Sequence, residues 1–491
     1  MTRLKSLLMF GCFLLCLATI LFVLLANTKL RVTAEHIKVE LDSVISIEQR
    51  QNNIWNISDK GPISPSLYYC NFPSANDEFT AEEGKPPKSS WVLKQIQVVI
   101  RHGDRSPIGF ELYKKLKVRP DYCQLRPNHQ PSHPSLKQFR KTISLDHTRL
   151  IMQGRKLITS PFPRSEICGS ATLSQLGVVQ HIHNGEILRK MYIQNHNLLA
   201  EAIKNKAEIA NKILVVSTTR SRTVQSAIAF LYGLIPDFHL DQVDIKYSNS
   251  DIFSMKKCPA VSLLEQNIKN MRYKIYIEHQ KKNSTFRKLA DGFGINDHSG
   301  VLIDSFVTGF LCKNYKLPCA GNQSCVTVKD LDVLLEEEEY MMKRISKESY
   351  YVNQSILRLR PLLHRISKMI MNKISNDTKP DVVLISGHDT TLKPLIRSLG
   401  IPEYRWPRLG TRLVFELWFD PDTNQHFVRI LLNGKDYTMQ TACCKTQEHH
   451  HDSSKVCNVN NFFSFVTSGI FKHFSAKTHD EACNTAPLFM N

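Results

Sequence analysis

The chain has 491 residues, of which 42% are hydrophobic. A chain of this length and composition can bury a large core and is expected to contain more than one structural unit. Lysine and arginine number 64 against 45 aspartate and glutamate, so the formal net charge is +19. A basic surface favours anionic partners, namely nucleic acid, a membrane or an acidic polysaccharide, and the targeting signals described next exclude nucleic acid.

The N-terminus carries a predicted membrane anchor. Residues 6–28 contain no charged side chain, and an apolar stretch of this length can span a bilayer. Basic residues flank both ends, so the charge rule leaves the orientation ambiguous. The short tail, residues 1–5, favours a type II signal anchor with a cytoplasmic tail, and a cleaved signal peptide is the alternative. Residues 29–90 lack sustained periodicity and contain several prolines, which predicts a lumenal stem.

Glycosylation sequons and cysteines predict that the rest of the chain is lumenal. Of 13 cysteines, all but Cys12 and Cys16 lie beyond the anchor. In an oxidising compartment most should be paired, and the odd number leaves at least one free. Nucleic acid is therefore not an expected partner. The predicted N-glycosylation acceptors are Asn56, Asn283, Asn322, Asn353 and Asn376.

A seven-residue motif follows the first predicted strand. The run Ile96–Ile100 is typical of a buried strand, and the next seven residues read Arg-His-Gly-Asp-Arg-Ser-Pro. Open α/β sheets bind ligands at the carboxyl ends of their strands. Guanidinium groups bind phosphoryl oxygens bidentately, and His102 between Arg101 and Arg105 would face the electrophilic phosphorus. The motif therefore indicates a phosphate site.

The segment after this motif, residues 110–168, is basic. It holds 12 lysines and arginines against four acids, a balance of +8. Two interpretations remain open: the segment receives an anionic polymer next to the site, or its charges form a solvated loop surface.

An amphipathic helix is predicted from Leu173 to Tyr192, with Ser174 as its N-cap. His181 and His183 lie two positions apart on this helix and do not share a face. That spacing favours structural histidines over metal ligands.

Two further strands end in residues that can bind phosphate or move protons. Lys212–Ser217 runs into a helix that carries Arg222 near its start, where helix amides also attract anions. Arg220 stands two residues earlier and is either a second charge of the phosphate site or a surface residue, and the surface role is favoured. Asp381–Ser386 is followed by Gly387, His388 and Asp389. A hairpin is predicted from strands at residues 413–418 and 427–432.

Residues 236–375 contain mostly segments with a helical pattern, and they are predicted to form a mainly helical cap. The acidic run Glu336–Glu339 within them is interpreted as a solvated helix face. The body is thus expected in two parts, residues 91–235 and residues 376–491 with a C-terminal tail. His449–His451 suggest metal by composition, but no spacing matches a ligand set, so no metal site is predicted.

The three strand-end motifs resemble the signatures of the histidine acid phosphatases over residues 91–435. The resemblance implies an α/β fold: a histidine-phosphatase-like core sheet flanked by helices, with the helical cap inserted. It implies that His102 is the nucleophile of a phosphohistidine mechanism and that Asp389 is the proton donor. Arg101, Arg105, Arg222 and His388 would bind the phosphate, and no cofactor or metal would be needed. Ser174 departs from the threonine usual in this family, which concerns packing.

Within this family, the anchored and lumenal layout is similar to that of members acting on a phosphorylated sugar of the proteoglycan linkage glycan. This resemblance implies a Golgi membrane protein with a glycosyltransferase partner. The alternatives are a phosphatase for another lumenal monoester, such as a phosphoprotein or an inositol phosphate, and a non-catalytic glycan-binding protein. A mutase-like member would lack the His-Asp pair, and Asp389 argues against it.

Overall fold

The computed structural model divides the chain into two compact units, Met1–Pro62 and Ile63–Asn491. The structure describes residues 64–74, 77, 80–154, 156–248, 258–280, 284–295, 299–320, 324–445, 456–474 and 476–485. The predicted tail, the predicted anchor at residues 6–28 and most of the predicted stem lie outside these residues. In the part of the chain that is described, no helix is both long and apolar enough to cross a membrane.

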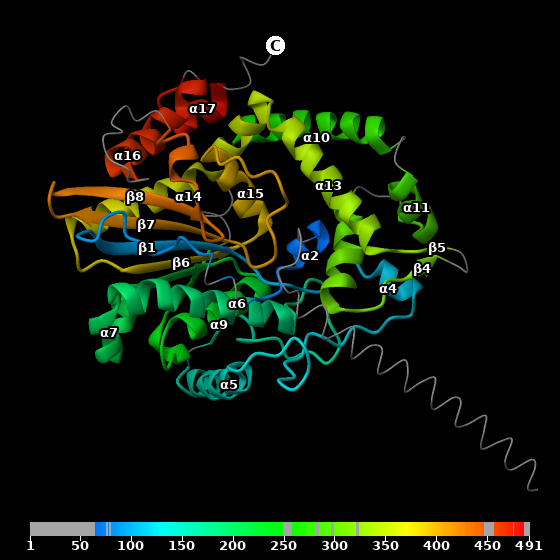
Figure 1. The fold of residues 1–491 in the computed structure, drawn as a ribbon, viewed down its shortest axis with the longest axis horizontal. Coiled ribbons are helices and arrows are strands. Elements are labelled where there is room, and N and C mark those ends of the chain that lie inside the picture. The colour runs from blue at the N-terminus through cyan, green and yellow to red at the C-terminus, as the bar shows by residue number, and fades with distance from the viewer. Residues whose placement is uncertain are drawn as a thin grey trace, which may run out of the picture. The chain divides into compact units, whose positions relative to one another are not determined.

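The second unit is built on one mixed β-sheet, which confirms the predicted α/β class (Figure 1). The strand order is β10-β8-β7-β1-β6-β2-β3, with β9 paired to β8. All five predicted strands are present. The strands are β1 (Val92–Arg101), β2 (Ile213–Ser217), β3 (Ile245–Tyr247), β6 (Val382–Gly387), β7 (Arg412–Asp420), β8 (Gln425–Leu432), β9 (Lys435–Asp436) and β10 (Cys457–Asn458).

The register brings three predicted motifs to one edge of the sheet. β1 and β2 both pair with β6 in parallel. Arg101 lies opposite Gly387, and Ser217 lies opposite Ser386. Because the strands are parallel, their carboxyl ends coincide, so the residues that follow each strand meet at the same place.

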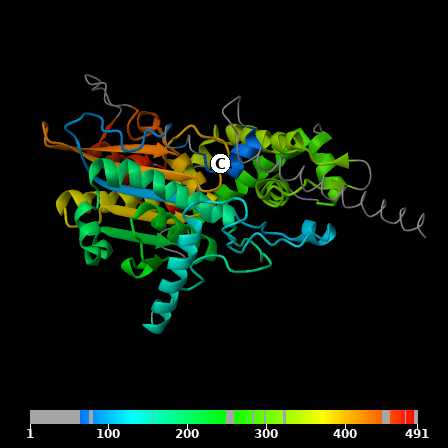
Figure 2. The same cartoon turned by 60° about the horizontal axis from the view of Figure 1, so that its bottom comes forward.

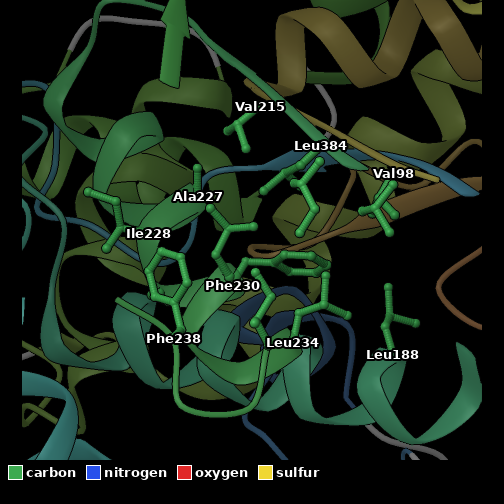
Figure 3. Packing of buried hydrophobic residues seen from close by; sticks show 14 of the residues in the cluster. Val98, Leu188, Val215, Ala227, Ile228, Phe230, Leu234, Phe238 and Leu384 are labelled. Carbon is green, nitrogen blue, oxygen red and sulfur yellow. The ribbon is translucent and has the colours of Figure 1, made fainter. Parts of the chain in front are cut away.

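Helices cover both faces of this sheet (Figure 1). On one face lie α6 (Gln175–Leu188) and α9 (Ser221–Leu234), whose apolar side chains pack on β1, β2 and β6. Figure 3 shows this core, where Phe230 and Leu234 of α9 meet Val98 and Leu384 of the strands. The other face is covered by α14 (Ser349–Ser375), α15 (Asp389–Ser398) and α16 (Val459–Thr467).

Two glycines let α6 and α9 approach each other closely. A Cβ on Gly185 would lie 2.2 Å from the carbonyl oxygen of Phe230, and a Cβ on Gly233 would lie 2.1 Å from that of Ile182. Side chains cannot occupy such space. The helix pair therefore needs glycine at both positions, and it supports the sheet directly beneath the predicted site.

A mainly helical block lies beside the sheet rather than on either face (Figures 1 and 2). Three elements of the range predicted as cap, residues 236–375, belong instead with the sheet. The strand β3 is its edge strand, the 3-10 helix η3 (Leu240–Gln242) packs on its core, and α14 packs on its other face through an apolar stripe. The remaining elements of this block, called the cap below, are α10 (Pro259–Gln280), α11 (Ser284–Phe293), α12 (Ser299–Leu302), the π-helix η4 (Ile303–Thr308), the 3-10 helix η5 (Leu311–Lys313), β4 (Cys319–Ala320), β5 (Ser324–Cys325) and α13 (Val328–Ile345).

The described part of the predicted stem is part of the folded body, and the prediction of a stem reaching to residue 90 is wrong there. Helix α2 (Pro65–Cys70) is tied to the cap by the disulfide Cys70–Cys312. Glu83 is fully buried and pairs with Arg412 of β7 through two bonds of 2.7 Å. The prolines and the lack of periodicity predicted irregular structure for this segment, and much of it is irregular. Irregular structure can nevertheless pack tightly when its polar groups have hydrogen-bond partners.

The cysteines and sequons can be placed only in part. Ten of the cysteines beyond the anchor form five disulfides, and Cys443 is the free cysteine of the described residues. Asn376 is exposed after α14, whereas Asn353 is half-buried within that helix. Asn56, Asn283, Asn322 and the run His449–His451 lie outside the described residues.

Other helices complete the body. They are α4 (Glu111–Lys115), α5 (Leu136–Met152), η1 (Arg189–Gln194), α7 (Ala200–Lys204), η2 (Lys206–Glu208), α8 (Ile209–Lys212), η3 (Leu240–Gln242), η6 (Thr438–Gln440), η7 (Gly469–Phe474) and α17 (His479–Thr485). The basic segment of residues 110–168 thus contains α4 and α5, closed by the disulfide Cys123–Cys168.

Candidate active site

A cavity of about 830 Å³ opens where the carboxyl ends of β1, β2 and β6 meet. All six residues predicted to act on phosphate line it, although they come from three stretches far apart in the sequence. They are Arg101, His102, Arg105, Arg222, His388 and Asp389.

His102 follows the last residue of β1 and is almost completely buried. Its Nδ1 lies 2.8 Å from the carbonyl oxygen of Gly103. A carbonyl only accepts, so the proton of the neutral ring is on Nδ1 and the lone pair is on Nε2. Burial, followed by the nearby charges of Arg101 and Arg222, lowers the pKa of His102 well below its usual value. The imidazole is therefore held neutral and nucleophilic.

The backbone after His102 is fixed by close packing. Gly103 donates its N–H to Ser226 Oγ at 3.1 Å, and a Cβ on Gly103 would lie 2.4 Å from the carbonyl oxygen of Gly177 in α6. No other residue fits at either glycine without moving the helix. The N-cap of α6 is Ser174, as predicted, because its side chain accepts from the N–H of Gly177.

Three arginines surround His102 with donors that are only partly used. Arg101 donates to the carbonyl of Pro407 and, at 3.0 Å, to the hydroxyl of Tyr69. Arg105 pairs with Asp304 at 2.8 Å. In Arg101, Arg105 and Arg222 the buried Nε–H has no acceptor among the described groups. Since buried donors are normally satisfied, this concentration of them favours binding of a multivalent oxyanion.

His388 and Arg222 hold each other. Arg222 donates to Nδ1 of His388 at 3.3 Å, so the remaining proton lies on Nε2, which is 3.0 Å from Thr218 Oγ1. Burial and the charge of Arg222 lower the pKa of His388 to about 4. Both nitrogens of the ring thus have protein partners, and His388 positions Arg222 in the cavity.

Asp389 is the first residue of α15 and lies in the same cavity. Its Oδ1 accepts from the N–H of Thr390 at 2.9 Å, and its Oδ2 accepts from the indole Nε1–H of Trp406 at 2.9 Å. Burial raises the pKa of this carboxyl, but Arg101, Lys393, Arg105 and the Trp406 hydrogen bond outweigh burial and lower it to about 2. The carboxyl group is therefore ionised near neutral pH.

The comparison with known families agrees with this geometry. The model of the histidine phosphatase superfamily (branch 2) matches residues 92–433.

This chain belongs to the histidine phosphatase superfamily, branch 2.

Two curated relatives and one solved structure give the range of similarity. The 2-phosphoxylose phosphatase 1 of Xenopus tropicalis is 33% identical over 438 residues, which cover 86% of this chain and 83% of the relative. The protein of the same name from Homo sapiens is 30% identical and covers 86% of this chain and 87% of its own. The phytase of Hafnia alvei with myo-inositol hexakis sulphate has 15% identity and a TM-score of 0.47, covering 77% of this chain and 97% of its own.

As a histidine acid phosphatase, the chain is an enzyme. Its cap contacts the motif that follows β1 through two ion pairs. The side chain of Lys313 of η5 is 2% exposed and forms an ion pair with Asp104, which is buried and accepts a hydrogen bond from Ser174. Asp304 of η4 holds Arg105. Sequence reasoning missed both cap residues, because neither lies near a motif. A π-helix such as η4 is a frequent mark of functional sites.

The acidic run on α13 is only in part the solvated face that its composition predicts: Glu336 is exposed, but Glu338 is not. Glu338 has no exposed surface and pairs with Arg272 of α10 at 3.0 Å and with Lys393 of α15 at 3.5 Å. A buried carboxylate requires such partners. Within the run, Glu338 is therefore a link between the cap and the core of this phosphatase.

Residues around the cavity fit the remaining predictions unevenly. Arg220 is exposed and also lines the cavity together with Lys115 of the basic segment, so it combines the two interpretations that the sequence left open. His181 is structural, as predicted: it is fully buried, its Nε2 lies 3.1 Å from the carbonyl of Arg101, and burial lowers its pKa to about 3. His183 lies 3.2 Å from Asp77.

Two groups of side chains in the described residues resemble metal ligands by composition. The first is Cys443 with Cys444 and Cys457, and the last two form a disulfide. The second is His133, His183 and Glu186. The backbone N–H of Ser135 donates to Nδ1 of His133, which leaves Nε2 protonated and donating to Glu186 at 3.2 Å. Neither group lines the phosphatase cavity.

Proposed function

We propose that this phosphatase removes the 2-O-phosphate from xylose in the proteoglycan linkage region, through a phosphohistidine at His102. The observation that carries the chemistry is the Nδ1–Gly103 hydrogen bond, which leaves Nε2 of a neutral imidazole free among three arginines. The relatives named 2-phosphoxylose phosphatase, at 33% and 30% identity, support the choice of substrate.

In the first step, His102 Nε2 attacks phosphorus in line with the ester oxygen, and the bond between phosphorus and that oxygen breaks. Asp389, protonated in the complex, gives its proton to the departing sugar oxygen. Arg101, Arg105 and Arg222 neutralise the equatorial oxygens as their charge increases.

The second step releases phosphate. Water attacks the phosphohistidine, its proton passes to the Asp389 carboxylate, and the nitrogen–phosphorus bond breaks to return neutral His102. In total, one phosphate ester and one water molecule give one alcohol and one inorganic phosphate. These residues supply the positive charge that the transferring group requires, so the proposed reaction uses no cofactor.

The lining of the cavity supports a substrate with a single phosphate and a partly apolar body. Beyond the arginines already described, its basic side chains are Lys115 and Arg220. Its remaining walls include apolar groups, which suit the carbon–hydrogen faces of a sugar better than a ring of phosphates. These apolar groups are Ile108, Leu112, Ile295, Val301, Ile303 and Trp406.

The proposal includes a cellular setting. A type II anchor at residues 6–28 would hold the body in the Golgi lumen, where proteoglycan linkage glycans are assembled, and a Golgi glycosyltransferase would be the partner. The five disulfides support an oxidising compartment.

A substrate panel tests the function. The purified full chain is assayed for kcat/KM on a linkage-region glycan with 2-phosphoxylose, a phosphoserine peptide, inositol hexakisphosphate and 4-nitrophenyl phosphate, with and without chelator. We expect the phosphoxylose glycan to be preferred by at least about tenfold, the gain available from a few well-placed contacts, and the chelator to change nothing. If the peptide or the inositol phosphate is preferred, the proposed substrate is wrong. If none of the four is hydrolysed, the proposal of an enzyme is wrong and a glycan-binding role takes its place.

A further inference from the structure

Trp406 lies at the point where the general acid, the catalytic arginines and the cap meet. It stands in the loop between α15 and β7 and lines the cavity. Its indole Nε1–H donates to Oδ2 of Asp389 at 2.9 Å. With Oδ1 held by Thr390, both oxygens of the carboxyl group are fixed, so the direction in which Asp389 presents its proton depends on Trp406.

The indole itself is held from two sides. The next residue, Pro407, accepts a hydrogen bond from Arg101 through its carbonyl oxygen. The ammonium of Lys393 lies 4.1 Å from the centroid of the Trp406 ring, within the range of a cation–π interaction. A Cβ on Gly300 of the cap would lie 3.4 Å from Cη2 of the ring, so the cap closes against its edge.

The cap also reaches Trp406 through charge. Lys393 is paired with Glu338 of α13, which has no exposed surface, and Glu338 is paired with Arg272 of α10. Because a buried carboxylate keeps its cations close, Lys393 is held over the indole by two cap helices. The position of the indole therefore depends on its contacts with the cap.

From this geometry we infer that Trp406 is the positioning residue of the general acid: its N–H aims Asp389 at the leaving oxygen and tunes how readily the proton is given. The inference rests on the proposed role of Asp389. An indole N–H can only donate, so it stabilises the carboxylate and favours proton release. The other groups that act on Asp389 are Arg101, Arg105 and Lys393, and His102, Arg222 and His388 line the same cavity.

Trp406→Phe tests this role, because it keeps a ring and removes the N–H. The leaving group separates positioning from general damage, since 4-nitrophenolate leaves without a proton and a sugar or alkyl oxygen does not. We expect kcat on a sugar or alkyl phosphate to fall roughly tenfold to a hundredfold, part of the range for a general acid. We expect 4-nitrophenyl phosphate to change less than about threefold, and the alkaline fall in kcat on the alkyl phosphate to move up by about one pH unit as the carboxylate loses a donor.

A matched control exists in the same chain. Trp418 of β7 is fully buried and donates its indole N–H to Glu416 at 2.7 Å, away from the cavity. Trp418→Phe removes the same kind of bond and should change neither the ratio between the two substrates nor the pH limb. If Trp406→Phe does not fold, Trp406→Leu and Trp406→His are compared, and the histidine, which retains a ring N–H, should keep more of the activity on alkyl phosphate.

The outcomes distinguish this inference from the function on which it rests. If the Asp389→Asn enzyme retains full activity on alkyl phosphate, Asp389 is not the general acid and the proposed mechanism is wrong. Asp389→Asn that loses activity, together with a Trp406→Phe enzyme that loses equally on both substrates or shows an unmoved pH limb, would overturn the role of Trp406 alone.

Discussion

The Nδ1 atom of His102 lies 2.8 Å from the carbonyl oxygen of Gly103, the residue that follows it in the chain. This contact between neighbours decides which ring nitrogen carries the proton. It is available only because Gly103 adopts a backbone position that packs directly on Gly177 of α6. The reactivity of the imidazole therefore depends on two glycines as well as on the arginines around it.

Replacing the nucleophile should abolish turnover and leave the fold intact. For His102→Ala we expect kcat to fall by about 10⁴-fold or more, the size of effect seen when a covalent nucleophile is removed. Rapid quenching of the wild type with ³²P-labelled substrate should trap an acid-labile phosphate on His102, located by peptide mapping. Label on any other residue would contradict the assignment, and circular dichroism of the variant controls for folding.

The pH dependence should follow from the two shifted groups. His102 must be neutral, and because its pKa is lowered well below its usual value, activity should persist well below pH 6.5. Asp389 must be protonated, and its pKa of about 2 should rise when a bound phosphate dianion offsets the charge of the arginines. Protonated Asp389 is lost as pH rises, so kcat should have an acidic optimum and fall above neutral pH.

Asp389→Asn checks the origin of that alkaline fall. We expect it to lower kcat on an alkyl phosphate by roughly 10² to 10⁴-fold, the contribution of a positioned acid, and to flatten the alkaline limb of the activity that remains on that substrate. Hydrolysis of 4-nitrophenyl phosphate, whose leaving group needs no proton, should fall much less. Undiminished hydrolysis of the alkyl phosphate at high pH by the wild type would speak against the acid.

The basic segment should recruit polyanionic substrates. The structure distinguishes lysines of this segment that are only exposed from one that also lines the cavity. Lys114 and Lys117 are exposed, whereas Lys115 lines the cavity and donates to the carbonyls of Phe293 and Gly294. Charges within about one Debye length, 8 Å at physiological salt, act on substrate concentration.

We therefore expect Lys114→Glu with Lys117→Glu to raise KM for a proteoglycan substrate by about tenfold and to leave 4-nitrophenyl phosphate unchanged, an effect that added salt should imitate in the wild type. Lys115→Glu should affect both substrates. No change on either substrate for the double variant would make these lysines a solvated surface.

Glu83 should be required for stability although it lies in the predicted stem. It is fully buried with Arg412, which also donates to Asn184. Glu83→Ala leaves that guanidinium buried without its anion, and we expect a loss of about 3–5 kcal/mol in the free energy of unfolding. Denaturant titration measures it, and exposed Glu111→Ala is the control. A chain started at residue 91 should be unstable for the same reason, whereas one started at residue 64 should fold.

The sequence by itself determined the parts of the site that are local. Three buried runs with strand character each end in a motif. Because parallel strands have their carboxyl ends at the same edge of a sheet, the sequence alone places His102, Arg222 and Asp389 at one edge, where the structure has them. The N-cap at Ser174 and the structural role of His181 were equally readable, because helix capping and facial spacing are properties of a few neighbouring residues.

Only the tertiary structure decided which distant residues support that site. Trp406, Lys313 and Glu338 lie outside every motif, and Glu83 is separated from Arg412 by 329 positions. Composition predicted a solvated acidic face and a loose stem because charged and proline-rich stretches usually are exposed. Whether such groups are buried depends on the partners that the packing of the cap and the sheet brings to them. Those partners are distant in the sequence, so no local pattern predicts them.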